Sequence, residues 1–439
     1  MADGATSTHA GVQAQLDRLA MLSPGRDVLG LSRISALLDA LGNPERQLPP
    51  QFHVAGTNGK GSTCTFLRAI LEAQGYRVHL FTSPHLVRYN ERIRVAGSLI
   101  EDEALSALLT EVLDASGDIQ PSFFEVTTAV AMLAFARTPA DACIFEVGLG
   151  GRLDATNILA RPLVCGIAGL AIDHKEFLLA PDPDTPSDPF ARIAFEKAGI
   201  AKAGTPLVTQ SYSAPMEQAI ADAAAKAGAP VVARDRDWFA ETSDGALQYR
   251  DAACTLSLPL PMLPGAHQAD NAALAVAMLR FQDRLPVSVD AMASGIKSAR
   301  WPARLQRLGA GSLTAHMPAS EVWLDGGHNP HAAREIRRFL EDKGPVTLIF
   351  GLLSNKELDG YLAELRGLPL HIIAIPVPDH MSHNPDRIAK SAQDFGFTAQ
   401  SAANVEDAAR LAQQAPVILI AGSLYLAGEV LRLNGEWPV

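Results

Sequence analysis

The residues with the clearest chemical potential lie in the segment 52–63, which reads FHVAGTNGKGST. A short apolar stretch leads into a turn with three glycines, and a lysine and two hydroxyl residues then precede an apolar pattern of helical spacing. Backbone N–H groups turned inward at glycines, the positive end of a helix and a lysine that reaches outer phosphates can together hold an anion. The segment therefore predicts a strand, a phosphate-binding loop and a helix, with Lys60 as the cation.

This loop departs from the plain P-loop pattern, because Val54 and Gly61 stand where that pattern has a glycine and a hydroxyl residue. On the glycines alone, an ordinary glycine-rich turn would be the better interpretation. The lysine and the hydroxyl groups at the expected helix start favour phosphate binding.

A carboxylate and a group of arginines are the next candidates. Glu146 follows an apolar stretch at 143–145 that predicts a buried strand. Ligands collect at the carboxyl ends of strands in open α/β sheets, and Mg²⁺ favours a carboxylate there, although an edge salt bridge is the simpler alternative. Arg88, Arg92 and Arg94 lie close together in an acidic chain, so we expect them to form a surface that receives carboxylates.

The elements that must position these residues alternate along the chain. Apolar patterns of helix and strand period predict an α/β fold, and 439 residues exceed the size of one hydrophobic core. We predict domains at 1–296 and 297–439, with a linker at 294–301. The segment 238–261 predicts short antiparallel strands, and 31–41 predicts a helix with Ser32 as its N-cap.

Composition excludes several classes of protein. The formal net charge of −11 argues against non-specific nucleic-acid binding, which needs a basic face. No apolar run approaches the roughly 20 residues of a membrane span, and no signal-peptide pattern is seen at the start. The four cysteines lack metal-ligand spacing, so we expect reduced thiols and a cytoplasmic location.

Several motifs resemble one family in order along the chain. GTNGKGS is similar to the phosphate loop of the Mur ligase superfamily, and specifically of folylpolyglutamate synthases. SPHLVRYNERIRV, EVGLGGRLDATN, FEKAGI and DGGHNP also match bifunctional dihydrofolate and folylpolyglutamate synthases. The resemblance implies a Mur-ligase-type P-loop ATPase domain with a central, mostly parallel sheet, followed by a smaller Rossmann-like α/β domain. It also implies ATP-dependent ligation of L-glutamate to dihydropteroate and to reduced folates through an acyl phosphate.

The same resemblance implies the site residues. ATP would be contacted by the loop, by one helix and by the second domain: Thr57, Asn58, Gly59, Lys60, Gly61, Ser62, Asn271, Arg304 and Asp325. The pteroate pocket would comprise Leu29, Arg88, Ser122, Phe123, Phe124, Glu125, Leu153, Asp154 and Ala155. Mg²⁺ would be held by Ser83, Glu146 and His174, and glutamate by His328 and Ser423. The catalytic groups would be Lys60, Arg304 and Lys197, a lysine that is carbamylated in many Mur-type ligases.

Two departures from the family pattern stand out. A longer, proline-rich excursion at 178–190 precedes FEKAGI, and Ala303 replaces the usual glycine of the W-P-G-R motif. The alternatives are a synthase that only extends glutamate tails, another Mur-type amide ligase, and a P-loop switch without covalent chemistry. We expect only small-molecule partners, a monomer, and ATP and Mg²⁺ as cofactors, with a monovalent cation as a further candidate.

Overall fold

The computed structural model describes residues 5–22, 29–180, 182 and 185–438, which form two compact units. Unit 1 comprises residues 1–84, 89–262 and 268–300. Unit 2 comprises residues 85–88, 263–267 and 301–439. The chain thus contributes two short segments from its first part to the second unit, and the predicted domain boundary at 296/297 stays a prediction.

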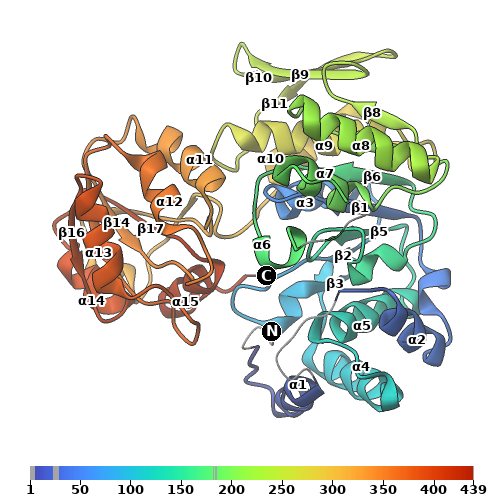
Figure 1. The fold of residues 1–439 in the computed structure, drawn as a ribbon, viewed down its shortest axis with the longest axis horizontal. Coiled ribbons are helices and arrows are strands. Elements are labelled where there is room, and N and C mark those ends of the chain that lie inside the picture. Colours follow the sequence, from blue (N-terminus) through green and yellow to red (C-terminus); the bar gives the residue numbers. More distant parts are fainter. Residues whose placement is uncertain (1–4, 23–28, 181, 183–184, 439) are drawn as a thin grey trace. The chain divides into compact units, whose positions relative to one another are not determined.

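Unit 1 is built on an eight-stranded sheet with the order β4-β3-β2-β5-β1-β6-β7-β8 (Figure 1). The pairs from β2 to β8 are parallel, whereas β3 and β4 are antiparallel at one edge. The predicted mostly parallel sheet is therefore confirmed. Its strands are β1 Gln51–Ala55, β2 Val78–Phe81, β3 Ile93–Val95, β4 Ser98–Leu99, β5 Ala142–Glu146, β6 Val164–Ile167, β7 Leu207–Thr209 and β8 Val231–Ala233.

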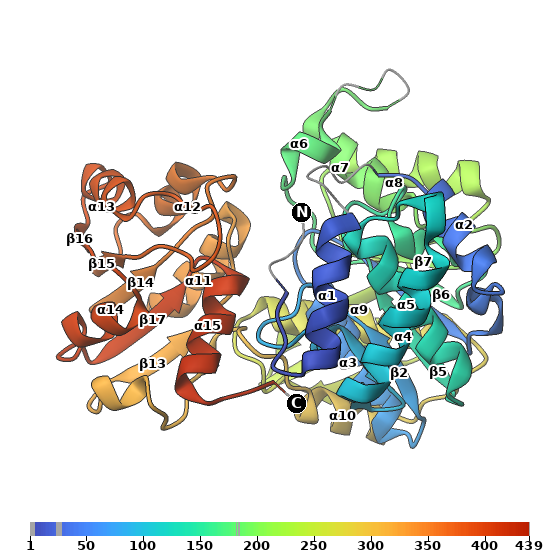
Figure 2. The same ribbon diagram turned by 90° about the horizontal axis from the view of Figure 1, so that it is seen from below.

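Helices pack on this sheet with apolar faces. The described helices of this part of the chain are α1 Ala10–Leu22, α2 Ser32–Ala40, α3 Lys60–Ala73, α4 Asp102–Ala115, α5 Phe123–Arg137, α6 Lys175–Leu178, α7 Pro189–Ala198, α8 Ala214–Ala227, α9 His267–Arg280 and α10 Val289–Ser298. Figure 2 shows α1, α4 and α5 side by side, and their buried faces share one core with Phe81 and Phe145 of the sheet. A second core lies between β1, β6 and β7 and the helices α7 and α8.

The predicted antiparallel strands at 238–261 are confirmed as a separate three-stranded sheet. It comprises β9 Trp238–Ser243, β10 Ala246–Asp251 and β11 Thr255–Pro259.

Two boundary predictions are wrong. The N-cap of α2 is Leu31 rather than Ser32, which is the first helical residue. Residues 294–298 of the predicted linker form the last turns of α10, because Gly295 packs directly against Ile70 of α3 and its helix continues.

Unit 2 contains a six-stranded sheet with the order β12-β13-β17-β14-β15-β16, drawn in yellow to red in Figure 1. All pairs are parallel except β12 with β13, so a Rossmann-like α/β unit is confirmed. Its strands are β12 Gln306–Arg307, β13 Glu321–Leu324, β14 Val346–Phe350, β15 Leu370–Ala374, β16 Thr398–Ser401 and β17 Val417–Ala421. Its helices are α11 Pro330–Leu340, α12 Leu358–Leu365, α13 Pro385–Asp394, α14 Val405–Leu411 and α15 Leu424–Asn434.

Within the described residues, no helix is both long and apolar enough to cross a membrane.

Candidate functional site

The glycine loop joins the buried strand β1 to α3, as predicted. Gly59 is the N-cap of α3 and has a φ of +85°, a conformation that favours glycine. A Cβ on Gly59 would lie 2.3 Å from Oδ1 of Asn271, so the side chain of Asn271 lies directly against the loop. The structure therefore brings Asn271 of α9 to the loop, although these residues are far apart in the sequence.

Part of the loop is held by residues 169–171, which follow β6. The amides of Thr57 and Asn58 donate to the carbonyl oxygen of Gly169, at 2.8 and 3.1 Å, and the hydroxyl of Thr57 donates to Ala171. The first amides of α3 have no carbonyl partner within the helix, so they and the helix dipole favour an anion at Lys60–Ser62.

Lys60, Glu146 and Ser83 come together beside the loop. The Nζ atom of Lys60 lies 4.0 Å from Oε1 of Glu146, which is buried at the end of β5. The backbone amide of Ser83 donates to Oε2 of Glu146 at 3.2 Å. A buried carboxylate beside a serine at a strand end is a donor set that suits a hard divalent ion, because such an ion needs few protein ligands and keeps several waters.

His174, the third predicted metal ligand, lies at the N-cap of α6 with a φ of +49°. Its amide donates to Oδ1 of Asp173 at 2.8 Å. In the part of the chain that the structure describes, no cluster of three or more His, Cys, Asp or Glu side chains forms a ready metal site. The metal-binding role of His174 therefore stays a prediction.

Lys197 is buried near the C-terminal end of α7, in strong electrostatic coupling to the loop. Burial, followed by the charge of Lys60, lowers the pKa of Lys197 to about 7. The carboxylates of Asp173, Asp154 and Glu196 act in the opposite direction. Lys60, Asp154 and Lys197, which the sequence assigned to three separate motifs, are thus brought into one neighbourhood.

Asp154 has a clear structural role. Its carboxylate is buried, and it accepts hydrogen bonds from the amides of Leu149 and Thr156 and from the hydroxyl of Thr156. Burial raises the pKa of this carboxyl group, with the hydrogen bonds opposing the shift. Ala155 lies in the core and Leu153 is half-buried, so contact with a pteroate stays a prediction for all three.

The segment Ser122–Glu125 forms the start of α5. Ser122 and Glu125 make a capping box, in which the Ser122 hydroxyl accepts from the Glu125 amide and the Glu125 carboxylate accepts from the Ser122 amide. Phe123 is buried against Tyr89 in the core. Phe124 is half-buried, and a Cβ on Gly148 would lie 2.4 Å from its ring. Phe124 is therefore the aromatic residue of this segment with a face nearest the loop after β5.

Leu29 is half-buried and lies before α2. The preceding residues 23–28, which include part of the segment RDVLGLSRI, lie outside the described residues, as do residues 181, 183 and 184 of the proline-rich excursion.

The predicted surface of three arginines is wrong for Arg92, whereas carboxylate binding by Arg88 and Arg94 stays a prediction. Arg92 is 1% exposed, with its guanidinium 5.6 Å above the ring of Tyr89 and 5.4 Å above that of Phe123. Arg94 donates to the carbonyl of Gly97. Arg88 belongs to unit 2, where it donates to the carbonyl of Pro438. Cation–π contacts explain the burial of Arg92, which charge counting along the sequence cannot detect.

In unit 2, three predicted residues follow the neighbouring strands β13 and β17, and Arg304, which precedes β12, lies close to one of them. Asp325 accepts from the amides of Leu305 and Gly327, and a Cβ on Gly326 would lie 3.1 Å from Nη1 of Arg304. Nδ1 of His328 lies 3.3 Å from the carbonyl oxygen of Gly326. Ser423 caps α15, and the following Leu424 packs on Gly326.

Ala303, which departs from the family glycine, has a φ of +55° and is fully buried. The left-handed backbone at this position explains why a glycine is usual there.

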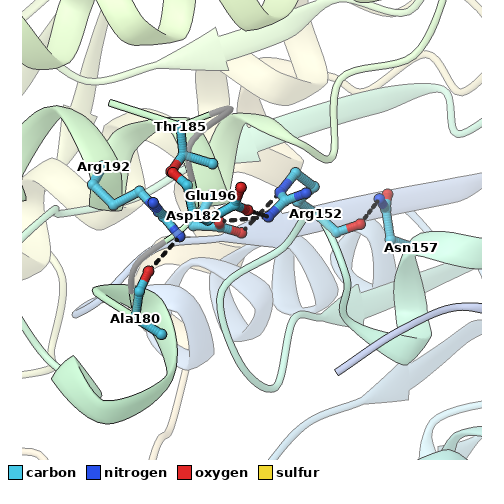
Figure 3. A network of polar contacts seen from close by, with 7 residues as sticks. All are labelled: Arg152, Asn157, Ala180, Asp182, Thr185, Arg192 and Glu196. Atoms are coloured by element: carbon cyan, nitrogen blue, oxygen red, sulfur yellow. Dashed lines mark hydrogen bonds and ion pairs between the residues drawn. The ribbon is translucent and has the colours of Figure 1, made fainter. Parts of the chain in front are cut away.

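A buried ion-pair cluster was not predicted as functional. Arg152 and Arg192 form ion pairs with Glu196, which precedes Lys197 in the chain (Figure 3). The available signal was that Arg152 and Glu196 lie inside two of the matched motifs.

The fold and the loop define a P-loop nucleotide-binding α/β protein with a second α/β unit. Residues 313–433 match the family model of the dihydrofolate synthetase C-terminal domain. The chain is 36% identical to the dihydrofolate synthase/folylpolyglutamate synthase of Escherichia coli, over 92% of this chain and 91% of that one.

Solved structures agree with this relationship. The Escherichia coli protein in complex with DHPP and ADP matches with a TM-score of 0.86 and 34% identity, over 96% of this chain and 97% of that one. A bifunctional folylpolyglutamate synthase/dihydrofolate synthase with Mn, AMPPNP and L-glutamate bound matches with a TM-score of 0.83 and 33% identity, over 97% and 99%. The chain belongs to the dihydrofolate synthase/folylpolyglutamate synthase family.

Proposed function

We propose that this protein is an ATP-dependent ligase that joins L-glutamate to dihydropteroate and to the γ-carboxylate of reduced folates. The observation that carries the proposal is the near full-length match to a dihydrofolate synthase/folylpolyglutamate synthase at 36% identity. The glycine loop beside Lys60 and Glu146 supports it, because this arrangement suits the phosphates of ATP and a divalent cation.

The reaction has two steps. A carboxylate oxygen of the folate substrate attacks the γ-phosphorus of ATP, so that a P–O bond to ADP breaks and an acyl phosphate forms. The amine of L-glutamate then attacks the acyl carbon, phosphate leaves and an amide remains. Lys60 and Arg304 would neutralise the charge that develops on the transferring group, and the protein contributes mainly positioning and electrostatic stabilisation.

The ligand sites extend this proposal. We assign ATP to Thr57–Ser62, Asn271, Arg304 and Asp325, and glutamate to His328 and Ser423. Ser83, Glu146 and His174 would hold the divalent cation, which we take to be Mg²⁺ and which would shield the phosphate oxygens. The pteroate site would use the ring of Phe124 together with Leu29 and Leu153, whereas Ser122, Phe123, Glu125, Asp154 and Ala155 would support it from beneath.

Lys197 is the candidate for carbamylation. Because burial lowers its pKa to about 7, a large fraction of its amine is neutral at neutral pH. A neutral amine can attack carbon dioxide, which gives a carbamate and releases one proton. The carbamate of Lys197 would carry a negative charge that attracts the charge of Lys60, whereas the protonated amine of Lys197 is repelled by it. We also propose that the protein is a monomer. We propose a cytoplasmic location as well, because the four cysteines are free thiols, as expected in a reducing compartment.

Product analysis tests the proposal. Purified protein, ATP, Mg²⁺ and L-glutamate are incubated with dihydropteroate or with tetrahydrofolate, and the masses of the products are measured by mass spectrometry. We expect one added glutamyl residue on each substrate. Addition to tetrahydrofolate alone would show a tail-extending synthase, and ATP hydrolysis indifferent to both substrates and to glutamate would overturn the ligase assignment.

A further inference from the structure

Two arginines form ion pairs with the buried carboxylate of Glu196 (Figure 3). Arg152 makes two hydrogen bonds to it, from Nε to Oε2 at 3.2 Å and from Nη2 to Oε1 at 2.9 Å. Arg192, one helical turn before Glu196, places Nε 3.4 Å from Oε1. Glu196 is only 4% exposed, so its carboxylate is largely removed from water and these partners compensate for its burial. The guanidinium of Arg152 also lies over the ring of Phe195, 5.4 Å from its centre, which fixes its plane.

The backbones of the two partners are in contact as well. The amide of Arg152 donates to the carbonyl oxygen of Glu196 at 2.8 Å. A Cβ on Gly151 would lie 2.9 Å from that oxygen, and a Cβ on Gly199 would lie 2.3 Å from Cβ of Arg152. Two glycines thus allow the loop 148–154 to lie directly on residues 196–199 of α7 and its C-terminal end.

The side chain of Asn157 adds a third link between the loop and the end of α7. The Nδ2 atom of Asn157 donates to the carbonyl oxygens of both Arg152 and Gly199, at 3.0 Å each. The loop and the helix end are therefore joined on both sides of Lys197, by side chains before it and by Asn157 after it. Neither segment can shift along the other without breaking at least one of these hydrogen bonds.

Lys197 follows Glu196 in α7, so the two side chains point about 100° apart around the helix. Glu196 is directed to Arg152, while Lys197 is in the electrostatic field of Lys60 and Asp154. Asp154 lies in the same loop as Arg152. The contact between Arg152 and Glu196 thus sets the spacing between the loop that carries Asp154 and the helix that carries Lys197.

We propose that Arg152 and Glu196 are a positioning pair for the ligase reaction, which holds Lys197 at a fixed place relative to Lys60 through the backbone of α7. This inference rests on the proposed function. The pair does not touch the reacting atoms itself, and Arg192 supports it through an ion pair with Oε1 of the same carboxylate.

A double-mutant cycle on the complete chain tests the proposal, with the variants Arg152→Gln, Glu196→Gln and their combination, and with Arg152→Lys as the conservative variant. We expect kcat to fall about 10²-fold in each single variant with the KM of ATP changed less than about threefold, since an error of about 1 Å in a catalytic group can cost that much. The double variant should lose no more than the single ones, and Arg152→Lys should recover about tenfold.

The matched control is Arg137→Gln, which removes an exposed two-point pair with Glu111 from the same unit. It should leave kcat and KM unchanged. Losses of kcat that add in the double variant, or that follow only the folded fraction measured by circular dichroism, would overturn the positioning role.

Hydrogen exchange gives a readout that is independent of the reaction. Amides at 151–154 and 196–200 should exchange about tenfold faster in Arg152→Gln and at the wild-type rate in Arg137→Gln. Unchanged exchange in Arg152→Gln would contradict the proposal. If the wild-type protein fails to add glutamate to any substrate, the proposed function fails, whereas the exchange result still decides whether this pair holds Lys197.

Discussion

At the residue scale, the account depends on how burial changes charge. Lys60 lies at the start of a helix, 4.0 Å from the buried carboxylate of Glu146, whereas burial lowers the pKa of Lys197 to about 7. Both lysines lie in one neighbourhood, and the second is perturbed partly by the first. Two lysines can therefore have different chemical roles within one site, because desolvation favours the neutral form of Lys197.

Replacing Lys60 tests the loop directly. We expect Lys60→Gln to lower kcat by about 10²- to 10³-fold, because the substitution keeps a polar side chain, one atom shorter, and removes the charge that stabilises the transferring phosphoryl group. Steady-state kinetics with ATP, dihydropteroate and glutamate measure this. Lys226→Gln, at an exposed position of α8, is the control and should behave as the wild type. A loss below threefold in Lys60→Gln would contradict the assigned role.

His53 should make the protein sensitive to acid. Burial, followed by the charge of Lys202, lowers its pKa to about 3 from 6.5. The unfolded chain binds a proton below pH 6.5 and the folded chain does not until about pH 3, so the free energy of unfolding falls as the pH drops through this range. The slope is about 1.4 kcal/mol per pH unit for one proton.

Urea unfolding of His53→Gln at pH 7, 6 and 5 measures this effect. The variant should be less stable at pH 7, because His53 bonds to Thr156, but its stability should fall less steeply with acid. His316→Gln, at an exposed histidine, should keep the wild-type slope. Parallel curves for wild type and His53→Gln would refute the prediction.

The residue scale also shows where sequence reasoning stops. Lys60 and Glu146 could be placed after the carboxyl ends of two strands from apolar pattern and motif alone. Contacts between distant segments bury Arg92 against two aromatic rings and join Arg152 to Glu196 by hydrogen bonds. No local pattern marks such contacts.

At the scale of elements, the glycine loop and the start of α5 have different requirements. In the loop, Gly59 needs both a left-handed backbone and room for Asn271. Gly59→Ala should therefore weaken the binding of ADP at least about tenfold, measured by calorimetry. Gly75→Ala is the matched control, because Gly75 has a φ of +98° with no atom within 4 Å of an added Cβ.

The control separates backbone strain from the clash. Gly75→Ala should cost about 1–2 kcal/mol of stability and leave ADP affinity unchanged. Equal affinity losses in the two variants would show that strain, rather than contact with Asn271, is responsible.

The capping box at α5 can be separated from substrate binding. Ser122→Ala should lower the free energy of unfolding by about 1 kcal/mol, because the amide of Glu125 loses its acceptor. The KM for dihydropteroate should stay within about twofold of the wild type. A tenfold rise in this KM with unchanged stability would show that Ser122 contacts the substrate instead.

The elements themselves were largely predictable, because strands with apolar runs and helices with regular spacing carry their own signal. The N-cap of α2 was misplaced by one residue, and α10 continues into the predicted linker. The second error lies where α10 packs on α3, with Gly295 against Ile70, and such a tertiary contact leaves no local signal.

At the scale of the whole molecule, the chain forms two α/β units, and both sheets were predicted from alternating strands and helices. The assignment of residues 85–88 and 263–267 to unit 2 was not predictable, since these segments are short and lie within sequence that otherwise builds unit 1.

The transfer of an oxygen atom tests the central claim that a folate carboxylate is phosphorylated by ATP and then captured by glutamate. Dihydropteroate labelled with ¹⁸O in its carboxylate is incubated with the protein, ATP, Mg²⁺ and L-glutamate, and the released phosphate is analysed by mass spectrometry. We predict that each phosphate formed together with an amide carries one ¹⁸O atom and that ADP carries none. Unlabelled phosphate, or the appearance of the label in AMP, would contradict the account.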